Sequence, residues 1–193
     1  IPGQEPVLQF RHAHLPLLMM DAPEKVVVIC FGVGNTVQAA SLHPSVTTLE
    51  VVDLSRDILE QAPHFAETNH GVLEDPRVNV FVNDGRHHLL MREPGTYDLI
   101  TLEPPPLAMA GVASLYTREF LALAKSRLRE GGALTQWMPG LQLSAPATLS
   151  LVRAFVEVFP EAVMLNGFGT DMILLGRKDR PATLDPDQLA RKL

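Results

Sequence analysis

The chain has 193 residues, of which 46% are hydrophobic and 20% charged, and its formal net charge is −6. This composition is that of one globular domain and excludes a disordered, collagen-like or coiled-coil chain. Because the net charge is negative, we expect no nucleic-acid partner and no binding to an anionic membrane surface through charge alone. The one cysteine, Cys30, excludes an internal disulfide, and its place in an apolar run predicts a small buried side chain.

Neither a membrane span nor a secretory signal is predicted. The longest uncharged apolar run covers nine residues, 26–34, less than half of the roughly 20 that a membrane-spanning helix needs. No basic region followed by an apolar stretch marks a secretory signal. The chain begins with Ile1, so we expect it to be a piece of a longer protein, and membrane segments are expected only outside the given chain.

In chain order, an arm with four prolines comes first, within the first 24 residues, and it holds a short apolar helix around residues 15–20. Apolar β-branched runs then alternate with helical patterns. The predicted strands are residues 25–31, 46–53, 78–82, 97–103 and 133–138, and the predicted helices are 36–42, 56–67, 116–128 and 144–158. Gly131 and Gly132 are expected to end the third helix. Strands at 162–168 and 172–176 close the pattern as a hairpin.

This alternation predicts an α/β fold with a doubly wound, mostly parallel sheet of seven strands. The closing antiparallel hairpin is typical of the Rossmann-like fold of S-adenosylmethionine-dependent methyltransferases, whereas a nicotinamide-binding domain normally stays parallel. We expect residues 25–177 to form this methyltransferase-like catalytic domain. Residues 1–24 are expected to form an arm with a short helix, and residues 178–193 a loosely attached polar tail.

Ligands of such sheets bind at the carboxyl ends of the strands. Gly32 and Gly34 follow the first strand, where they permit a tight turn and a close approach of backbone N–H groups to a ligand. The third glycine of a dinucleotide fingerprint would fall at Val37, which argues against NAD. Asp53 ends the next strand, 21 residues after Gly32, where a carboxylate accepts both ribose hydroxyls; a helix-capping aspartate is the alternative.

Two more carboxylates follow strands. Asp84, before Gly85, is placed to accept a hydrogen bond from an adenine amino group, and an ordinary Asp-Gly turn is the alternative. Glu103 precedes three prolines, 104–106, which stiffen its loop. Its carboxylate can hold a cationic amine and then take a proton from it as general base. An ordinary charged residue at a strand end is the alternative. Trp137, at the end of the fifth strand, lines a pocket or belongs to the core.

No metal site is expected. The adjacent His87 and His88 point to different faces of a helix, and His12 and His14 have no third ligand at a usable spacing. The chain also lacks the nucleophile elbow of hydrolases and the phosphate-binding loop of nucleotide triphosphatases.

The chain resembles the spermidine synthase (polyamine aminopropyltransferase) family, and most of all the bacterial spermidine synthase-like domains that are often fused to membrane segments. The resemblance covers roughly residues 9–177. It rests on the segments His14–Pro16, Val28–Gly34, Asn69–Val78, Asn83–Arg86, Tyr97–Pro106, Ser114–Phe120 and Gln136–Trp137. Glu103–Pro106 and Ser114–Phe120 are specific by themselves, and the other segments are specific only together.

The resemblance implies a transferase that moves an aminopropyl group from decarboxylated S-adenosylmethionine to an amine such as putrescine. Since the sulfonium donor is already activated, the protein has to align the amine and remove a proton. The implied donor-binding residues are Gln9, Gly32, Gly34, Asn35, Asp53, Asp84 and Gly85, the implied base and amine ligand is Glu103, and Tyr116 and Trp137 are the other implied substrate-binding residues. The resemblance further implies a small-molecule amine as partner, no metal and a homodimer. It also implies a cytoplasmic location, either as a separate protein or as the soluble domain of a membrane protein.

Three departures from the family pattern bear on the function. Pro106 stands where the family has a second loop carboxylate, and Asn35 where it has an acidic residue. The family's N-terminal strand domain is mostly absent, so that residues 1–24 are its remnant. A neutral Asn35 would tolerate a donor that still carries its carboxylate. Two alternatives therefore stay open: an S-adenosylmethionine-dependent methyltransferase acting on an amine, and a non-catalytic nucleoside-binding module of a longer membrane protein.

Overall fold

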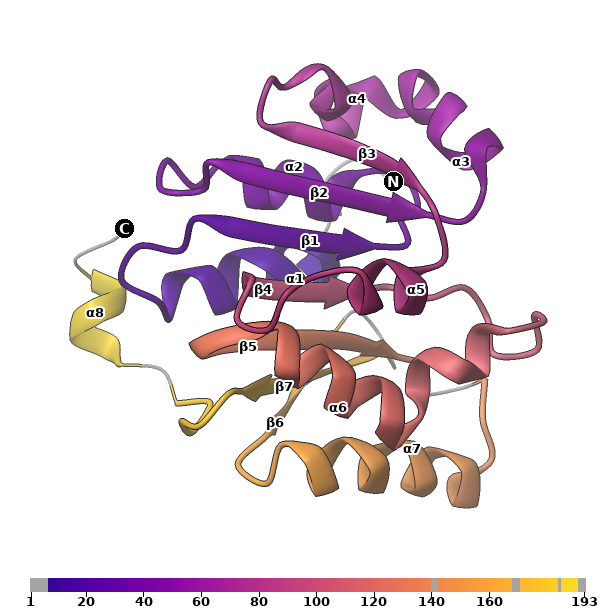
Figure 1. The fold of residues 1–193 in the computed structure, drawn as a ribbon, viewed down its shortest axis with the longest axis vertical. Coiled ribbons are helices and arrows are strands. Elements are labelled where there is room, and N and C mark those ends of the chain that lie inside the picture. Colours follow the sequence, from indigo (N-terminus) through magenta and orange to yellow (C-terminus); the bar gives the residue numbers. More distant parts are fainter. Residues whose placement is uncertain (1–6, 140–141, 168–170, 184, 191–193) are drawn as a thin grey trace.

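The computed structural model describes residues 7–139, 142–167, 171–183 and 185–190, and in this part of the chain one sheet is covered by helices on both faces (Figure 1). The sheet has seven strands in the order β3-β2-β1-β4-β5-β7-β6. The strands are β1 (Lys25–Ile29), β2 (Thr48–Asp53), β3 (Val78–Val82), β4 (Tyr97–Leu102), β5 (Leu128–Met138), β6 (Val163–Asn166) and β7 (Met172–Arg177).

The helices of the described chain alternate with these strands. They are α1 (Val7–Leu18), α2 (Asn35–Ser41), α3 (Arg56–Glu60), α4 (Ala66–Asn69), α5 (Gly85–Leu90), α6 (Arg118–Arg127), α7 (Ala145–Val158) and α8 (Pro186–Ala190). Three short 3-10 turns occupy Ala62–Phe65, Val72–Glu74 and Val112–Tyr116. None of the helices described is both long and apolar enough to cross a membrane.

The first five strands run parallel, and β7 pairs antiparallel with both β5 and β6. The chain winds outward from β1 through β2 to β3 and then returns to β4 on the other side of β1. The carboxyl ends of β1 and β4 therefore flank the point where the winding reverses, which is the ligand-binding position of doubly wound sheets. The predicted doubly wound sheet with an antiparallel end is confirmed.

Two apolar layers hold the sheet, because its central strands bury residues on both faces. Val26 and Val28 of β1 belong to the layer under α1 and α2, and Val27 and Ile29 belong to the layer under α5, α6 and α7. All four are at most 2% exposed. Because successive side chains of β1 enter opposite layers and both layers are apolar, every residue of the run has to be apolar.

The helix α1 is longer than the short helix expected at residues 15–20, and it is part of the body of the domain. Ala13 and Leu17 are fully buried beside the sheet. Pro16 lies inside the helix and has no N–H for the carbonyl of His12. Thr135 of β5 replaces that donor, since its Oγ1 donates to the His12 carbonyl at 2.9 Å. A side chain of the sheet thus satisfies the carbonyl that a proline left open.

Gly131 and Gly132 do not end a helix, as expected, but lie inside β5. The helix α6 already ends at Arg127, and the β4–β5 register shifts between Tyr97 and Leu99. Gly131 has a φ of +74°, and a Cβ on Gly132 would stand 2.9 Å from the carbonyl oxygen of Asp98. The glycines therefore permit a bulge and a close approach of the two backbones.

Two other segments differ from their expected form. The helix expected at 56–67 is divided into α3, a 3-10 turn and α4, with Pro63 in the first positions of the turn, where it removes a backbone donor. After β7, Ala182 is 6% exposed and packs in the layer under α1. The beginning of the segment expected to be a loosely attached tail is therefore held on the domain.

Candidate active site at the carboxyl ends of the strands

The loop from β1 to α2 makes the first wall of the site. The backbone φ angles are +69° at Cys30, +58° at Gly32 and +91° at Gly34. A Cβ on Gly34 would stand 2.6 Å from Cζ of Phe31, so this position requires glycine for space as well as for its backbone conformation. No atom lies within 4 Å of a Cβ built on Gly32, so the loop backbone is open to a ligand there.

Asp53, at the end of β2, fixes this loop from the neighbouring strand. Its Oδ2 accepts a hydrogen bond from the Phe31 N–H at 2.8 Å, and its Oδ1 accepts one from the Ser55 N–H at 2.9 Å. Neither bond caps α3, whose N-cap residue is Ser55, so the alternative of a helix-capping aspartate is not realised. Each carboxylate oxygen can still accept a second bond, so these contacts leave room for the expected ribose hydroxyls.

Asp84 and Gly85 form the start of α5, at the end of β3. Oδ1 of Asp84 accepts a hydrogen bond from the His87 N–H at 2.8 Å and caps the helix. The side chain is exposed, and its Oδ2 remains available for a ligand. A Cβ on Gly85 would stand 2.4 Å from Cγ2 of Ile29, so this glycine is needed for close packing of α5 on β1.

Glu103, directly after β4, is held by a residue that the sequence did not reveal. Thr36, in the first turn of α2, donates a hydrogen bond from Oγ1 to Oε1 of Glu103. Thr36 is 4% exposed, whereas Glu103 is half-buried. Of the three prolines that follow, Pro104 is buried and the other two are exposed. A threonine two positions after Gly34 was the available signal, but its partner is 67 residues away in the chain.

Cys30, directly after β1, lies within reach of the charges of the three strand-end carboxylates. Burial raises the pKa of its thiol to about 12, and the charges of Asp53, Glu103 and Asp84 raise it further in that order. One thiol feels all three carboxylates, so their fields overlap at the end of β1 and favour a bound cation. The expectation of a buried Cys30 is corrected, because the residue is half-buried and takes a left-handed backbone conformation directly after β1.

Asn35 begins α2 beside this cluster. Its side-chain Oδ1 is buried and accepts no hydrogen bond within the part of the chain described here. The side chain carries no charge. It therefore adds a polar acceptor at the start of α2 without adding to the negative field of the carboxylates.

Tyr116 and Trp137 are brought together, but with different roles. The Tyr116 hydroxyl donates to the Trp137 carbonyl at 3.1 Å, and the ring is 4% exposed in the layer under α6 and α7. Burial raises the pKa of Tyr116. Trp137 itself is half-buried, and its indole N–H has no acceptor among the described residues. Tyr116 therefore braces the end of β5, while Trp137 presents part of its ring at the edge of the sheet.

His12 of α1 was weighed in the sequence only as a metal ligand. The structure buries it completely, with Nδ1 3.4 Å from Oγ1 of Thr101. Burial lowers the pKa of His12, while the charge of Glu103 acts in the opposite direction. The side chain of Gln9, on the same helix, lies outside the described residues. Across the described ranges, no three His, Cys, Asp or Glu side chains gather as a metal site.

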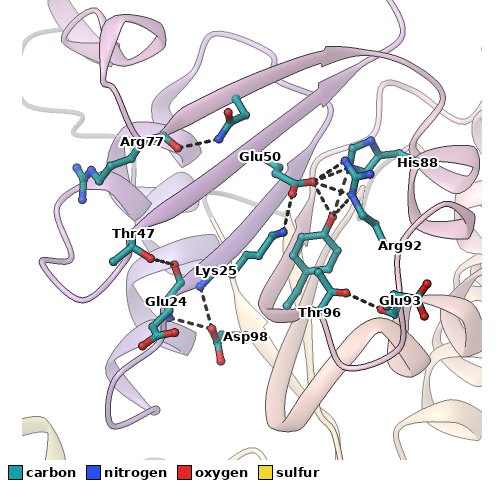
Figure 2. A network of polar contacts seen from close by, with 12 residues as sticks. Glu24, Lys25, Thr47, Glu50, Arg77, His88, Arg92, Glu93, Thr96 and Asp98 are labelled. Carbon is teal, nitrogen blue, oxygen red and sulfur yellow. Dashed lines mark hydrogen bonds and ion pairs between the residues drawn. The ribbon is translucent and has the colours of Figure 1, made fainter.

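A second polar cluster lies on the α5 side of the sheet, towards the amino ends of the strands (Figure 2). Glu50 of β2 is 5% exposed, and its Oε1 contacts Nζ of Lys25 at 2.9 Å. Its Oε2 accepts hydrogen bonds from Tyr97 and His88 at 2.7 Å each and from Arg92 at 3.2 Å. The sequence showed only a glutamate between apolar residues. This network anchors α5, which begins at Asp84 and Gly85, to the sheet.

The model of the spermine/spermidine synthase domain matches residues 8–167. Polyamine aminopropyltransferase 2 of Pseudomonas aeruginosa is 35% identical over 130 residues, covering 66% of this chain and 36% of that protein. The chain spans about half the length of the curated relatives it matches.

The fold is shared with solved structures. Spermidine synthase from Thermotoga maritima superimposes with a TM-score of 0.82 at 21% identity, over 96% of this chain and 65% of that one. Human methyltransferase-like protein 13, in complex with SAH, superimposes with a TM-score of 0.76 at 18% identity, over 95% of this chain and 88% of that one.

Proposed function

Because the chain belongs to the spermine/spermidine synthase family, we propose that it transfers an aminopropyl group from decarboxylated S-adenosylmethionine to a small amine such as putrescine. The observation that carries this proposal is that Asp53, Asp84 and Glu103 follow β2, β3 and β4 at one edge of the sheet, where the charges of all three reach Cys30 at the end of β1. A cationic sulfonium donor and an ammonium acceptor are the ligands that such a field favours.

The donor is bound at the ends of the first three strands. The open backbone at Gly32 and the Asp53 carboxylate receive the ribose, and the available oxygen of Asp84 receives the adenine amino group. The donor's aminopropyl carbon then lies towards Glu103. This orientation is the main contribution of the protein, since the sulfonium needs no further activation.

Glu103 acts on the acceptor. Its carboxylate holds the ammonium group and takes one proton, which frees the nitrogen lone pair. The nitrogen attacks the carbon next to the sulfonium, the new C–N bond forms as the C–S bond breaks, and the electron pair of that bond neutralises the sulfur. The products are methylthioadenosine and the extended amine. The Thr36 hydroxyl keeps the Glu103 carboxylate in place during this exchange.

The test is the release of methylthioadenosine from decarboxylated S-adenosylmethionine and putrescine, followed by chromatography. We expect Glu103→Gln to lower kcat by about a hundredfold to ten-thousandfold with donor affinity unchanged. Glu67→Gln, an exposed position on α4, is the matched control and should act like the parent protein. No release with any amine of a broad panel at high enzyme concentration would refute the proposal.

A methyltransferase acting on an amine is the second candidate, and Asn35 favours it. Its uncharged side chain with an unused acceptor oxygen does not repel the carboxylate of ordinary S-adenosylmethionine. Calorimetric titration with both donors separates the two functions. A clear preference for the decarboxylated donor contradicts methyl transfer, and a preference for the ordinary donor, with methylation of an amine, contradicts aminopropyl transfer.

We also propose that the protein acts in the cytoplasm and as a homodimer, as the family resemblance implies. Sedimentation of the purified full-length protein tests the second point, because a species of one chain's mass at all concentrations would contradict it.

A further inference from the structure

The edge strand β3 leaves main-chain groups without a partner. It is the first strand of the sheet, so β2 is its one neighbour among the described strands (Figure 1). The Asn83 N–H donates to the Asp53 carbonyl of β2 at 3.0 Å, and in a parallel pair alternate residues face the neighbouring strand. Val80 and Val82 therefore direct their N–H and C=O groups to the open side. No described residue forms a hydrogen bond with these groups there.

The side chains of this edge are apolar and do not protect it. Val80 is 43% exposed and Val82 is 45% exposed. The strand, residues 78–82, contains no charged residue and no proline, and its register with β2 is regular. Exposed edge strands normally carry lysine, proline or a bulge, because these features prevent pairing with another chain. The edge of β3 is therefore one that a further strand can extend.

A groove of about 660 Å³ lies beside this edge, lined by Val80–Asn83 of β3 and by Arg56, Leu59 and Glu60 of α3. Arg56 and Glu60 are exposed and stand one helical turn apart, a spacing that suits an ion pair. Neither of them has an ion-pair partner in the part of the chain that the structure describes. Ile58, midway between them, is 41% exposed. The surface thus combines apolar side chains with one unpaired charge of each sign.

The open groups of β3 match those of a second copy related by a twofold axis. With the axis at Phe81, Val80 lies opposite the partner's Val82, and each of these residues exchanges both of its backbone hydrogen bonds with the residue opposite. A register centred on Val80 would instead need the N–H of Val78. That N–H already donates to the Asp75 carbonyl at 2.9 Å, so the register centred on Phe81 is favoured.

A twofold axis also pairs the charges of α3. When the two α3 helices pack antiparallel across the axis at Ile58, Arg56 faces the partner's Glu60, and Glu60 faces the partner's Arg56. The exposed Ile58 is covered by its own counterpart. An unrelated partner would have to supply an apolar strand and both charges in matching places, whereas a second copy carries all of them in the order that the symmetry requires.

We propose that β3 and α3 form a twofold interface with a second copy of this chain, in which the two β3 strands pair antiparallel and join the two sheets. This inference rests on the homodimer proposed above and names the surface through which it forms. It does not depend on the reaction. Because β3 ends before Asp84 and α3 follows Asp53, the interface adjoins the donor-binding side of each copy.

The experiment measures the dissociation constant of the dimer by sedimentation of the full-length protein over a range of concentrations. Val80→Pro removes an N–H that faces away from β2, so the pairing with β2 is kept, and the constant should rise at least about a hundredfold. Arg56→Glu and Glu60→Arg each put like charges across the axis and should raise it about tenfold or more. The double variant restores opposite charges and should return to within about threefold of the parent.

An equimolar mixture of the two single variants gives the sharpest comparison. In a mixed dimer every charge at positions 56 and 60 faces one of the opposite sign, so the mixture should dimerise more tightly than either variant alone. Arg153→Glu is the matched control, because Arg153 is exposed on α7, at the opposite end of the sheet from β3 (Figure 1). It should dimerise like the parent protein, and circular dichroism checks that each variant keeps its fold.

The outcomes separate this interface from the rest of the proposed function. Single charge variants that dimerise like the parent, or a mixture that associates no more tightly than either of them, would overturn the interface and leave the homodimer standing. A parent protein with the mass of one chain at all concentrations would refute the homodimer and the interface together. The reaction is tested separately, by the release of methylthioadenosine.

Discussion

Replacing Glu50 by Gln tests the buried network on the α5 side of the sheet. The substitution keeps the size of the side chain but removes the negative charge that Lys25 and Arg92 share. Their side chains are 27% and 22% exposed, so part of each positive charge stays solvated, whereas the Glu50 side chain is 6% exposed. Breaking a buried ion pair costs about 3–5 kcal/mol, and the partial exposure of the partners favours the lower end, about 3 kcal/mol.

The same network predicts how stability depends on pH. Burial by itself would raise the pKa of Glu50, but hydrogen bonds from His88, Lys25 and Tyr97 lower it well below its ordinary value of 4.5. A carboxyl whose pKa is lower in the folded state stabilises the fold above that ordinary value and loses this effect as the pH falls towards the folded pKa. The stability difference between the parent and Glu50→Gln should therefore be constant near neutral pH and shrink below about pH 4.5.

Urea unfolding, followed by circular dichroism, measures both effects. The midpoint should fall with an unchanged slope, since the exposed area is the same. Glu67→Gln, which removes an exposed charge, is the control and should change the unfolding free energy by less than about 0.5 kcal/mol. A Glu50→Gln protein as stable as the parent, or a difference that grows on acidification, would refute the argument.

Three further substitutions test the site. Thr36→Val removes the hydrogen bond to Glu103, so kcat should fall by about tenfold to a hundredfold with donor affinity unchanged. Thr36→Ser keeps the hydroxyl and should retain activity. A lower donor affinity with an unchanged kcat would contradict this role. Asn35→Asp adds a negative charge to the donor side, and titration should show a preference for the decarboxylated donor raised at least about tenfold; an unchanged ratio would contradict it. Gly85→Ala forces a Cβ within 2.4 Å of Cγ2 of Ile29, so thermal unfolding should show a free energy of unfolding lower by about 1–3 kcal/mol. An unchanged free energy of unfolding would show that α5 can shift freely and would contradict this.

Much of the architecture was predictable because it depends on local patterns. The β-branched runs predicted the strands, and β3 occupies the predicted residues 78–82. Asp53, Asp84 and Glu103 were recognisable because each follows a strand, and parallel strands in a doubly wound sheet bring their carboxyl ends to one edge. Gly131 and Gly132 were expected to end a helix but lie in a bulged part of β5. Glycines after a helical pattern are compatible with a loop and with a bulged strand, and the pattern alone does not distinguish the two.

The sequence by itself determined the order of strands and helices and which side chains end the strands, since these follow from periodicity and from turn residues. Only the tertiary structure decided the partners. Thr36 meets Glu103 across 67 residues, and Thr135 meets the carbonyl of His12 across 123. Such pairs depend on which strands become neighbours and on the register between them, and no local pattern records either. The side chains at the strand ends could therefore be identified from the sequence, whereas the contacts that hold them in place could not.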